Sequence, residues 1–153
     1  MTQIKLLIVE DREENVNAAK QYFSSMPNVE VEFASDYEQG LEKLMKGFYA
    51  GAILDVELPK KAGMEPEKLG YDLAQKAMEC KTPHVLLTGY FHHGDISKVL
   101  LEDDNCCLKS GPVKSNPAAW EIAYIELSKI APLEMIQKAK DRYAKVKKLL
   151  QES

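Results

Sequence analysis

The chain has 153 residues and a mass of 17.2 kDa, a length typical of one domain. Its composition, with 45% hydrophobic and 29% charged residues, predicts a globular fold with a substantial core and argues against disorder. A net charge of -4 argues against nucleic acid as a partner. No apolar run approaches the roughly 18 residues of a membrane span. The N-terminus shows no signal-peptide pattern and the three cysteines form no disulfide or zinc pattern, so we expect a cytoplasmic protein without membrane contact.

Short apolar segments alternate along the chain with longer segments of helical periodicity. The predicted strands cover residues 4–9, 29–33, 50–56, 85–88 and, more weakly, 106–108. The predicted helices follow them, with apolar spacing over residues 16–26, 41–45, 71–78, 96–100 and 120–127. Strands that alternate with helices indicate a doubly wound α/β fold, a parallel sheet with helices on both faces.

Several residues at the ends of these segments predict where helices begin or end. Ser35 with Glu38 three positions later forms a capping-box pattern, and Gly47 is expected to end that helix. Asp95 is a candidate N-cap for the helix after the fourth strand. Asn116 followed by Pro117 predicts an N-cap with proline in the first helical turn.

Chemically active side chains stand at the ends of the predicted strands. Glu10 and Asp11 follow the first strand, and Asp55 follows the core of the third. Thr88 ends the fourth strand and Lys109 follows the fifth. Because the carboxyl ends of parallel strands share one edge of the sheet, these side chains are expected to converge there.

This set of residues suits phosphoryl chemistry. Three clustered carboxylates repel one another unless a cation lies among them, and oxygen ligands suit Mg²⁺. One carboxylate can then act as a nucleophile toward phosphorus. A lysine and a hydroxyl can bind the phosphoryl oxygens, because phosphoryl transfer depends mainly on positioning and charge compensation.

The motifs around these residues resemble the receiver domain of two-component response regulators. They read IKLLIVED at residues 4–11, ILDVELP at 53–59, LLTG at 86–89 and LKS at 108–110, and the resemblance covers roughly residues 4–130. It implies a flavodoxin-like sheet of five parallel strands in the order 2-1-3-4-5, with an extra C-terminal helix.

The resemblance also implies a role for each site residue. Asp55 is the expected phosphoacceptor, and Glu10, Asp11, Asp55 and the backbone carbonyl of Glu57 are the expected Mg²⁺ ligands. Thr88 and Lys109 are expected to bind the phosphoryl group. The implied partners are a sensor histidine kinase or a histidine phosphotransfer protein as donor, and a downstream protein target. The implied activity is limited to self-phosphorylation from small donors and slow autodephosphorylation.

Two departures from the receiver pattern concern the loops around the site. The glycine that receivers place about eight positions after the phosphoacceptor has its best counterpart in Gly70, 15 positions after Asp55. The extra segment, Lys60–Lys68, is expected at the mouth of the pocket, where it either selects a partner or shields the aspartate. The lysine loop also differs, since Ser110 stands where proline usually follows the lysine, and Lys114 is a rival for its role.

We divide the chain into a receiver-like domain, residues 1–131, and a helical extension, residues 132–153. From Leu133 onward the extension has six basic and three acidic residues. This segment is either an interaction helix for a partner or a second copy, or an amphipathic helix packed on its own domain. Formation of a homodimer through this segment is therefore one of the open alternatives.

Two other functions compete with the phosphorylated switch. The long loop and the altered lysine turn are compatible with a receiver fold that only binds a partner and is never phosphorylated. A phosphohydrolase of the haloacid-dehalogenase type also uses an aspartyl nucleophile with a hydroxyl and a lysine. Its nucleophile, however, ends the first strand of the core, whereas Asp55 is expected to end the third.

Overall fold

The computed structural model describes residues 2–88, 107–109 and 113–152, and for Thr88 and residues 107–109 it describes the backbone. The strands of the main sheet are β1 (Ile4–Val9), β2 (Val29–Ala34), β3 (Gly51–Leu54), β6 (His84–Thr88) and β7 (Cys107–Lys109). All pairings between them are parallel, in the order β2-β1-β3-β6-β7. The predicted doubly wound sheet and its 2-1-3-4-5 order are therefore confirmed.

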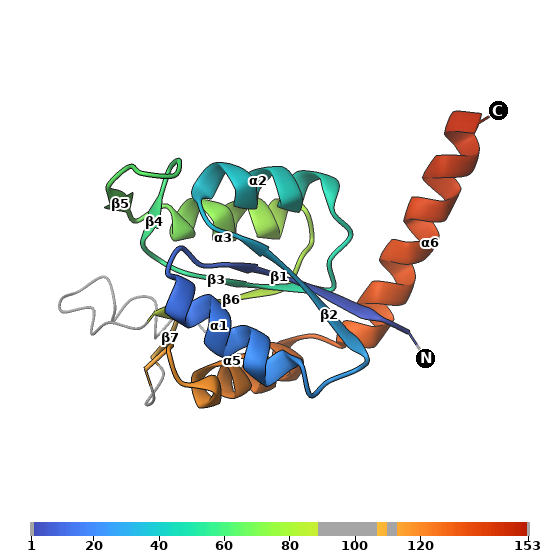
Figure 1. The fold of residues 1–153 in the computed structure, drawn as a ribbon. Helices are drawn as coiled ribbons and strands as arrows, with labels where there is room; N and C mark the ends of the chain where they lie inside the picture. Colours follow the sequence, from blue (N-terminus) through green and yellow to red (C-terminus); the bar gives the residue numbers. More distant parts are fainter. Residues whose placement is uncertain (1, 89–106, 110–112, 153) are drawn as a thin grey trace.

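Helices cover both faces of this sheet (Figure 1). They are α1 (Glu13–Phe23), α2 (Tyr37–Lys46), α3 (Gly70–Glu79), α5 (Pro117–Ile130) and α6 (Leu133–Glu152). The helix expected after Asp95 lies outside the described residues. Within those residues, no helix has both the length and the apolar character needed to cross a bilayer.

The central strands supply a separate hydrophobic core to each face, because successive side chains of a strand point to opposite sides. Leu6 and Ile8 of β1 pack with α1 and α5, in the cluster that contains Trp120. Leu7 and Val9 face the other side and pack with α2 and α3. Strand β1 is thus buried on both faces, as its almost continuous apolar sequence predicted.

The helix caps confirm two of the three predictions that fall in the described part of the chain. Asn116 caps α5 by accepting a hydrogen bond from the Ala118 amide, with Pro117 as the first helical residue. Gly47 is the C-cap of α2. The expected capping box at Ser35 is shifted by one residue, since Asp36 is the N-cap and accepts from the Gln39 amide at 2.8 Å. The carboxylate at position 36 is a stronger acceptor than the preceding hydroxyl.

The segment after Asp55 contains an element that the sequence did not predict. Strands β4 (Leu58–Pro59) and β5 (Pro66–Glu67) pair in antiparallel fashion and form a small hairpin. Gly63 near its tip has φ +89°, a left-handed conformation that suits glycine. The extra Lys60–Lys68 segment is therefore folded as most of a hairpin before α3 begins.

The last helix, α6, has a docked half and a projecting half. Gln137 is fully buried, accepts from the Lys5 amide at 2.9 Å and donates to the Phe48 carbonyl at 2.9 Å. Lys140 donates to the Tyr49 carbonyl at 2.6 Å and to Thr82 Oγ1 at 2.7 Å. Beyond these residues α6 leaves the domain and projects past the edge of the sheet opposite to the strand ends that carry Glu10 and Asp55 (Figure 1).

Candidate functional site

Three carboxylates meet where β1 and β3 end. Glu10 and Asp11 directly follow β1, and Asp55 directly follows β3, its parallel neighbour. One carboxylate oxygen from each lies within 4.8 Å of the others. Glu10 is 1% exposed, while Asp11 and Asp55 are partly buried and line a cavity. The structure thus brings together the three side chains that the sequence predicted as Mg²⁺ ligands.

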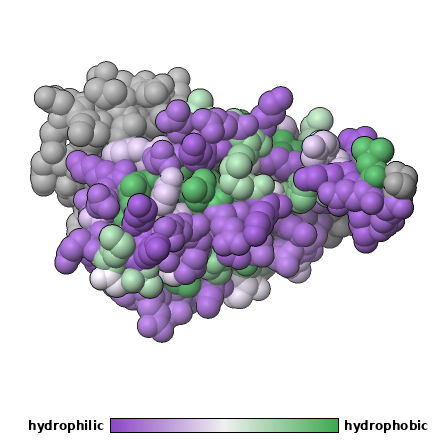
Figure 2. Space-filling model, turned by 90° about the horizontal axis from the view of Figure 1, so that it is seen from above, coloured by the Kyte–Doolittle hydropathy of each residue, from purple (hydrophilic) through white to green (hydrophobic). Residues whose placement is uncertain are grey.

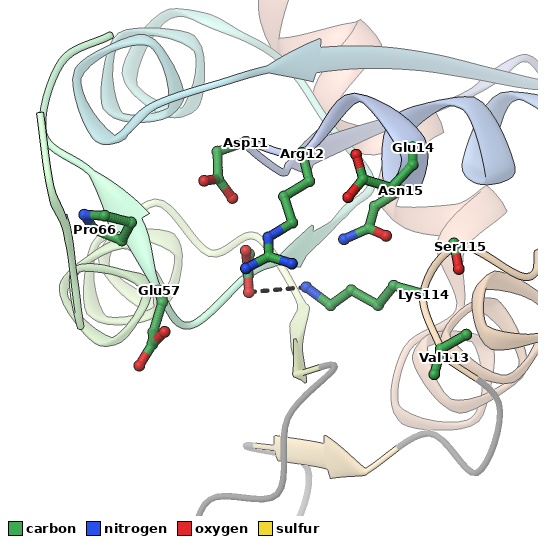
Figure 3. Close-up of a pocket in the computed structure, with 10 residues that line it drawn as sticks. Asp11, Arg12, Glu14, Asn15, Glu57, Pro66, Val113, Lys114 and Ser115 are labelled. Atoms are coloured by element: carbon green, nitrogen blue, oxygen red, sulfur yellow. Dashed lines mark ion pairs between the residues drawn. The ribbon is translucent and has the colours of Figure 1, made fainter. Parts of the chain in front are cut away.

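Lys114 forms ion pairs with two carboxylates of this cluster. Its ammonium lies 2.8 Å from Glu10 Oε1 and 2.8 Å from Asp55 Oδ1, and its side chain is only 4% exposed. Figure 3 shows Lys114 reaching across the cavity, with a dashed line for its ion pair with Asp55. Sequence reasoning named Lys114 only as a rival, whereas it is the lysine whose contact with Asp55 the structure describes.

The backbone around Lys114 is anchored from the core. The buried indole of Trp120 donates from Nε1 to the Lys114 carbonyl at 2.8 Å. The Asn116 amide donates to the Val113 carbonyl at 2.9 Å, which closes the turn before α5. The N-terminus of α5 and its only tryptophan therefore fix the position from which Lys114 extends.

Burial and the proximity of other charges shift the pKa values of Asp55, Asp11 and Lys114. Burial, reinforced by the negative charge of Glu10 and opposed by Lys114, raises the pKa of Asp55 to about 7. Burial and the charge of Glu10 also raise the pKa of Asp11. Burial by itself would lower the pKa of Lys114, but the charges of Asp55 and Glu10 outweigh it and raise that pKa. Asp55 therefore changes its protonation state near neutral pH.

An open cavity of about 210 Å³ gives access to Asp55. Asp11, Arg12 and Asn15 line one side of it, and Pro66 of the β4–β5 hairpin lines another. Arg12 and Asn15 point into the cavity in Figure 3. Sequence reasoning missed both, although Arg12 is the N-cap of α1 and Asn15 lies in its first turn, directly after the acidic pair.

Gly70 connects the inserted hairpin to the site. Its amide donates to the Val56 carbonyl at 2.9 Å, and a Cβ at this position would lie 2.0 Å from the Asp55 carbonyl oxygen. Such a contact is impossible, so only glycine allows α3 to begin against the end of β3. Gly70 therefore packs directly against the Asp55 backbone although it stands 15 positions away in sequence.

The other predicted site residues are placed less completely. Glu57 lines the cavity, with its carboxylate directed away from Lys114 (Figure 3). Thr88 and Lys109 are paired in register at the ends of β6 and β7, on the same edge of the sheet as the carboxylates. Their side chains lie outside the described part of the structure, so the roles predicted for them stay predictions.

The donor set fits a hard divalent cation. Three carboxylates within 4.8 Å offer only oxygen atoms, and Asp11 and Asp55 open to the cavity. Glu10 uses one oxygen for Lys114 and the other to accept the Arg12 amide at 3.1 Å, so it is held in place. The residues present can therefore bind Mg²⁺ beside the ammonium.

Comparison with solved structures identifies the class of fold. The chain is similar to a CheY-like response regulator receiver domain protein from Methanospirillum hungatei JF-1, with 25% identity and a TM-score of 0.63 over 90% of this chain and 99% of that one. It is also similar to the signal receiver domain of an HD domain-containing protein from Pseudomonas fluorescens Pf-5, at 23% identity and a TM-score of 0.59 over 83% and 98% of the two chains.

A third similar structure was solved as a complex. The response regulator TrrA from Thermotoga maritima, in complex with Mg(2+)-BeF, is 27% identical with a TM-score of 0.53, over 71% of this chain and 88% of that one. No protein-family model matches the chain, and no curated protein matches it significantly. The chain has the receiver fold of two-component response regulators, as its motifs predicted.

Proposed function

We propose that this protein is a phosphorylation-dependent signalling switch in which Asp55 accepts a phosphoryl group. The observation that carries the proposal is the cluster of Glu10, Asp11 and Asp55, with Lys114 bonded to the candidate acceptor at 2.8 Å. It stands at the carboxyl edge of a receiver sheet and opens to a cavity. The donor is a phosphohistidine on a sensor kinase or phosphotransfer protein, the output is a protein contact, and the site of action is the cytoplasm.

In this function Asp55 attacks the phosphorus atom of the donor. A bond forms between its carboxylate oxygen and phosphorus, while the phosphorus–nitrogen bond breaks and the imidazole leaves with the electron pair. Glu10, Asp11, Asp55 and the Glu57 carbonyl would hold Mg²⁺, which would supply charge compensation to the phosphoryl oxygens. Arg12 and Asn15 line the space in which those oxygens would lie.

We assign the phosphoryl-binding ammonium to Lys114. Its ammonium already contacts Asp55, and the Trp120 bond to its carbonyl holds its backbone in place. A preorganised cation near the acceptor stabilises charge in the transition state without reorganisation. Thr88, at the end of the neighbouring strand, is proposed to donate a hydrogen bond from its hydroxyl to a phosphoryl oxygen.

The test is labelling with acetyl phosphate and Mg²⁺, followed by intact-mass measurement. One added phosphate is expected in the wild type, and none in Asp55→Asn or when EDTA removes the metal. Glu14→Gln is the matched control: its carboxylate lines the same cavity, but no step of the proposal uses it, so labelling persists. Absence of wild-type labelling at every Mg²⁺ concentration would favour the binding module that is never phosphorylated.

The same assay separates the two lysines. Lys114→Met is expected to slow labelling by about tenfold or more, a typical effect of losing one electrostatic stabiliser. Lys109→Met is expected to have the smaller effect. The reverse order would return the role to Lys109 and leave the remainder of the proposal standing.

A further inference from the structure

A second concave surface lies far from the carboxylate cluster, between the end of α2 and the projecting half of α6. It is a groove of about 530 Å³. We call it the α6 groove and define it by six of its lining residues, Met45, Lys46, Phe48, Tyr143, Lys147 and Lys148. It is not part of the site described above, which opens at the opposite edge of the sheet (Figure 1).

The walls of the α6 groove are held in place by partly buried hydrogen bonds. Gln137 binds the Phe48 carbonyl and Lys140 binds the Tyr49 carbonyl, so α6 is bonded to the segment that forms the opposite wall. As a result the rings of Phe48 and Tyr143 lie 6.3 Å apart between centroids. These contacts therefore fix the part of the groove around Phe48 and Tyr143, while Lys147 and Lys148 extend it along the projecting half of α6.

The α6 groove combines exposed apolar groups with positive charge. Met45 and Tyr143 are each 63% exposed, which is high for large hydrophobic side chains at neighbouring positions. Three lysines line the groove, and none of its described lining residues is acidic. Residues 142–151 of α6 contain four basic residues and no acidic one. Hydrophobic surface amid hydrophilic side chains is visible on the projecting end of α6 in Figure 2.

We propose that the α6 groove binds an acidic segment of another protein, with an apolar side chain placed between Phe48 and Tyr143. Charge complementarity identifies this occupant: Lys46 already pairs with Glu42 at 2.8 Å, whereas Lys147 and Lys148 pair with no carboxylate among the described residues and are left to an anionic ligand. A second copy docked through the same surface would bring its own lysines against these. A flat anionic membrane would neutralise the lysines but would not fill a recess bounded by two helices.

This inference does not depend on phosphorylation of Asp55. It makes α6 a recognition element whose first half is anchored and whose second half is presented to a partner. The two interpretations of the C-terminal segment, packed on the domain or available to a partner, then apply to different halves of one helix. Binding at the α6 groove and labelling at Asp55 can each fail without the other.

The experiment uses the full chain and a fluorescein-labelled synthetic peptide of repeated Glu-Leu-Leu-Glu units. Fluorescence anisotropy is expected to show saturable binding that weakens about tenfold when glutamine replaces every glutamate of the peptide. The double variant Lys147→Glu/Lys148→Glu is expected to weaken binding about tenfold or more. Tyr143→Ala is expected to weaken it about fivefold through loss of apolar contact.

The matched control is Lys60→Glu/Lys61→Glu, which changes the net charge by the same amount at the exposed β4–β5 hairpin. Its binding is expected to equal that of the wild type. Equal losses in both double variants would show unspecific charge attraction and overturn the proposal, as would a Tyr143→Ala variant with unchanged affinity. All substituted side chains are exposed, so circular dichroism is expected to show unaltered folding.

Two further measurements distinguish the other occupants. Sedimentation velocity of the wild type is expected to show a monomer, and a dimer that dissociates in Lys147→Glu/Lys148→Glu would assign the α6 groove to a second copy. Flotation with vesicles of phosphatidylserine and phosphatidylcholine is expected to recover no protein. Flotation that the same variant abolishes would assign the groove to a membrane and overturn the proposal.

Discussion

Two lysines at opposite edges of one sheet, the buried Lys114 and the half-buried Lys140, are held by different chemistry. Lys114 lies between the carboxylates of Glu10 and Asp55, and their charges raise its pKa. Lys140 donates to the Tyr49 carbonyl and the Thr82 hydroxyl, and burial lowers its pKa. Where a lysine is needed only to attach a helix, neutral acceptors suffice. A cluster of carboxylates around a lysine indicates instead a candidate site for binding a cation and a phosphoryl group.

The largest effect is expected from Lys114→Met. Removing the ammonium leaves three carboxylates close together, two of them without their buried ion-pair partner. We expect a loss of about 3 kcal/mol in the free energy of unfolding by urea, measured without Mg²⁺ at about pH 8, where Asp55 is mostly ionised. Excess Mg²⁺ is expected to restore much of this stability, because the cation replaces the missing positive charge.

The exposed Lys129, which pairs with Glu126 at 3.0 Å, offers the control. Lys129→Met removes the same charge and is expected to change stability by less than about 0.5 kcal/mol, with no response to Mg²⁺. An equal loss for Lys114→Met with and without Mg²⁺ would show that Lys114 is a structural cation like Lys140. The contrast between the two edges would then disappear.

A smaller effect is expected from Gly70→Ala. The new Cβ would lie 2.0 Å from the Asp55 carbonyl oxygen and 2.7 Å from Val56 Cα, so the backbone that carries Asp55 must move. We expect a loss of about 2 kcal/mol and weaker Mg²⁺ binding in a titration followed by calorimetry.

Gly40→Ala in α2 is the matched control for this substitution. The three atoms nearest to its Cβ would belong to the side chains of Val9 and Leu73, at 3.0 to 3.3 Å, and alanine improves helix propensity by about 1 kcal/mol. Its effect on stability is therefore expected to be small, and Mg²⁺ binding is expected to be unchanged. If Gly70→Ala bound Mg²⁺ as tightly as the wild type does, Gly70 would be required for packing of α3 and not for the geometry of the Mg²⁺ site.

The sequence predicted the sheet and its acidic cluster because both depend on local patterns. Buried parallel strands are short apolar runs, and the residues that follow them share one edge whatever the loops contain. Glu10, Asp11 and Asp55 could be assigned to one place on that basis. The backbone pairing of Thr88 with Lys109 likewise places these two residues at the edge of the sheet where the sequence predicted them.

The features that the sequence did not predict depend on contacts between distant residues. Lys114 reaches Asp55 because Trp120 binds its carbonyl, and no periodic pattern encodes that hydrogen bond. The β4–β5 hairpin has strands of two residues, too short for alternation to be recognised. The docking of α6 depends on Gln137, a polar residue that pattern reasoning assigns to the surface but that is fully buried.

The smallest of the expected effects concerns Lys140→Met. The variant loses two hydrogen bonds to neutral oxygens, but it also removes the cost of a half-buried charge, so we expect a loss of about 1 kcal/mol in the free energy of unfolding that Mg²⁺ does not alter.

The effect of Lys140 on stability depends on pH with a definite sign. Since the folded-state pKa of Lys140 is lowered, the unfolded chain holds more protons between that pKa and the ordinary value of 10.5, and stability from this residue rises with pH in that window. The difference in unfolding free energy between wild type and Lys140→Met, measured by urea denaturation from about pH 8 to 10, should therefore grow with pH. A difference that stayed constant over this range would mean that the pKa of Lys140 is not lowered and that an anion compensates its burial, as for Lys114, which would remove the distinction between the two edges.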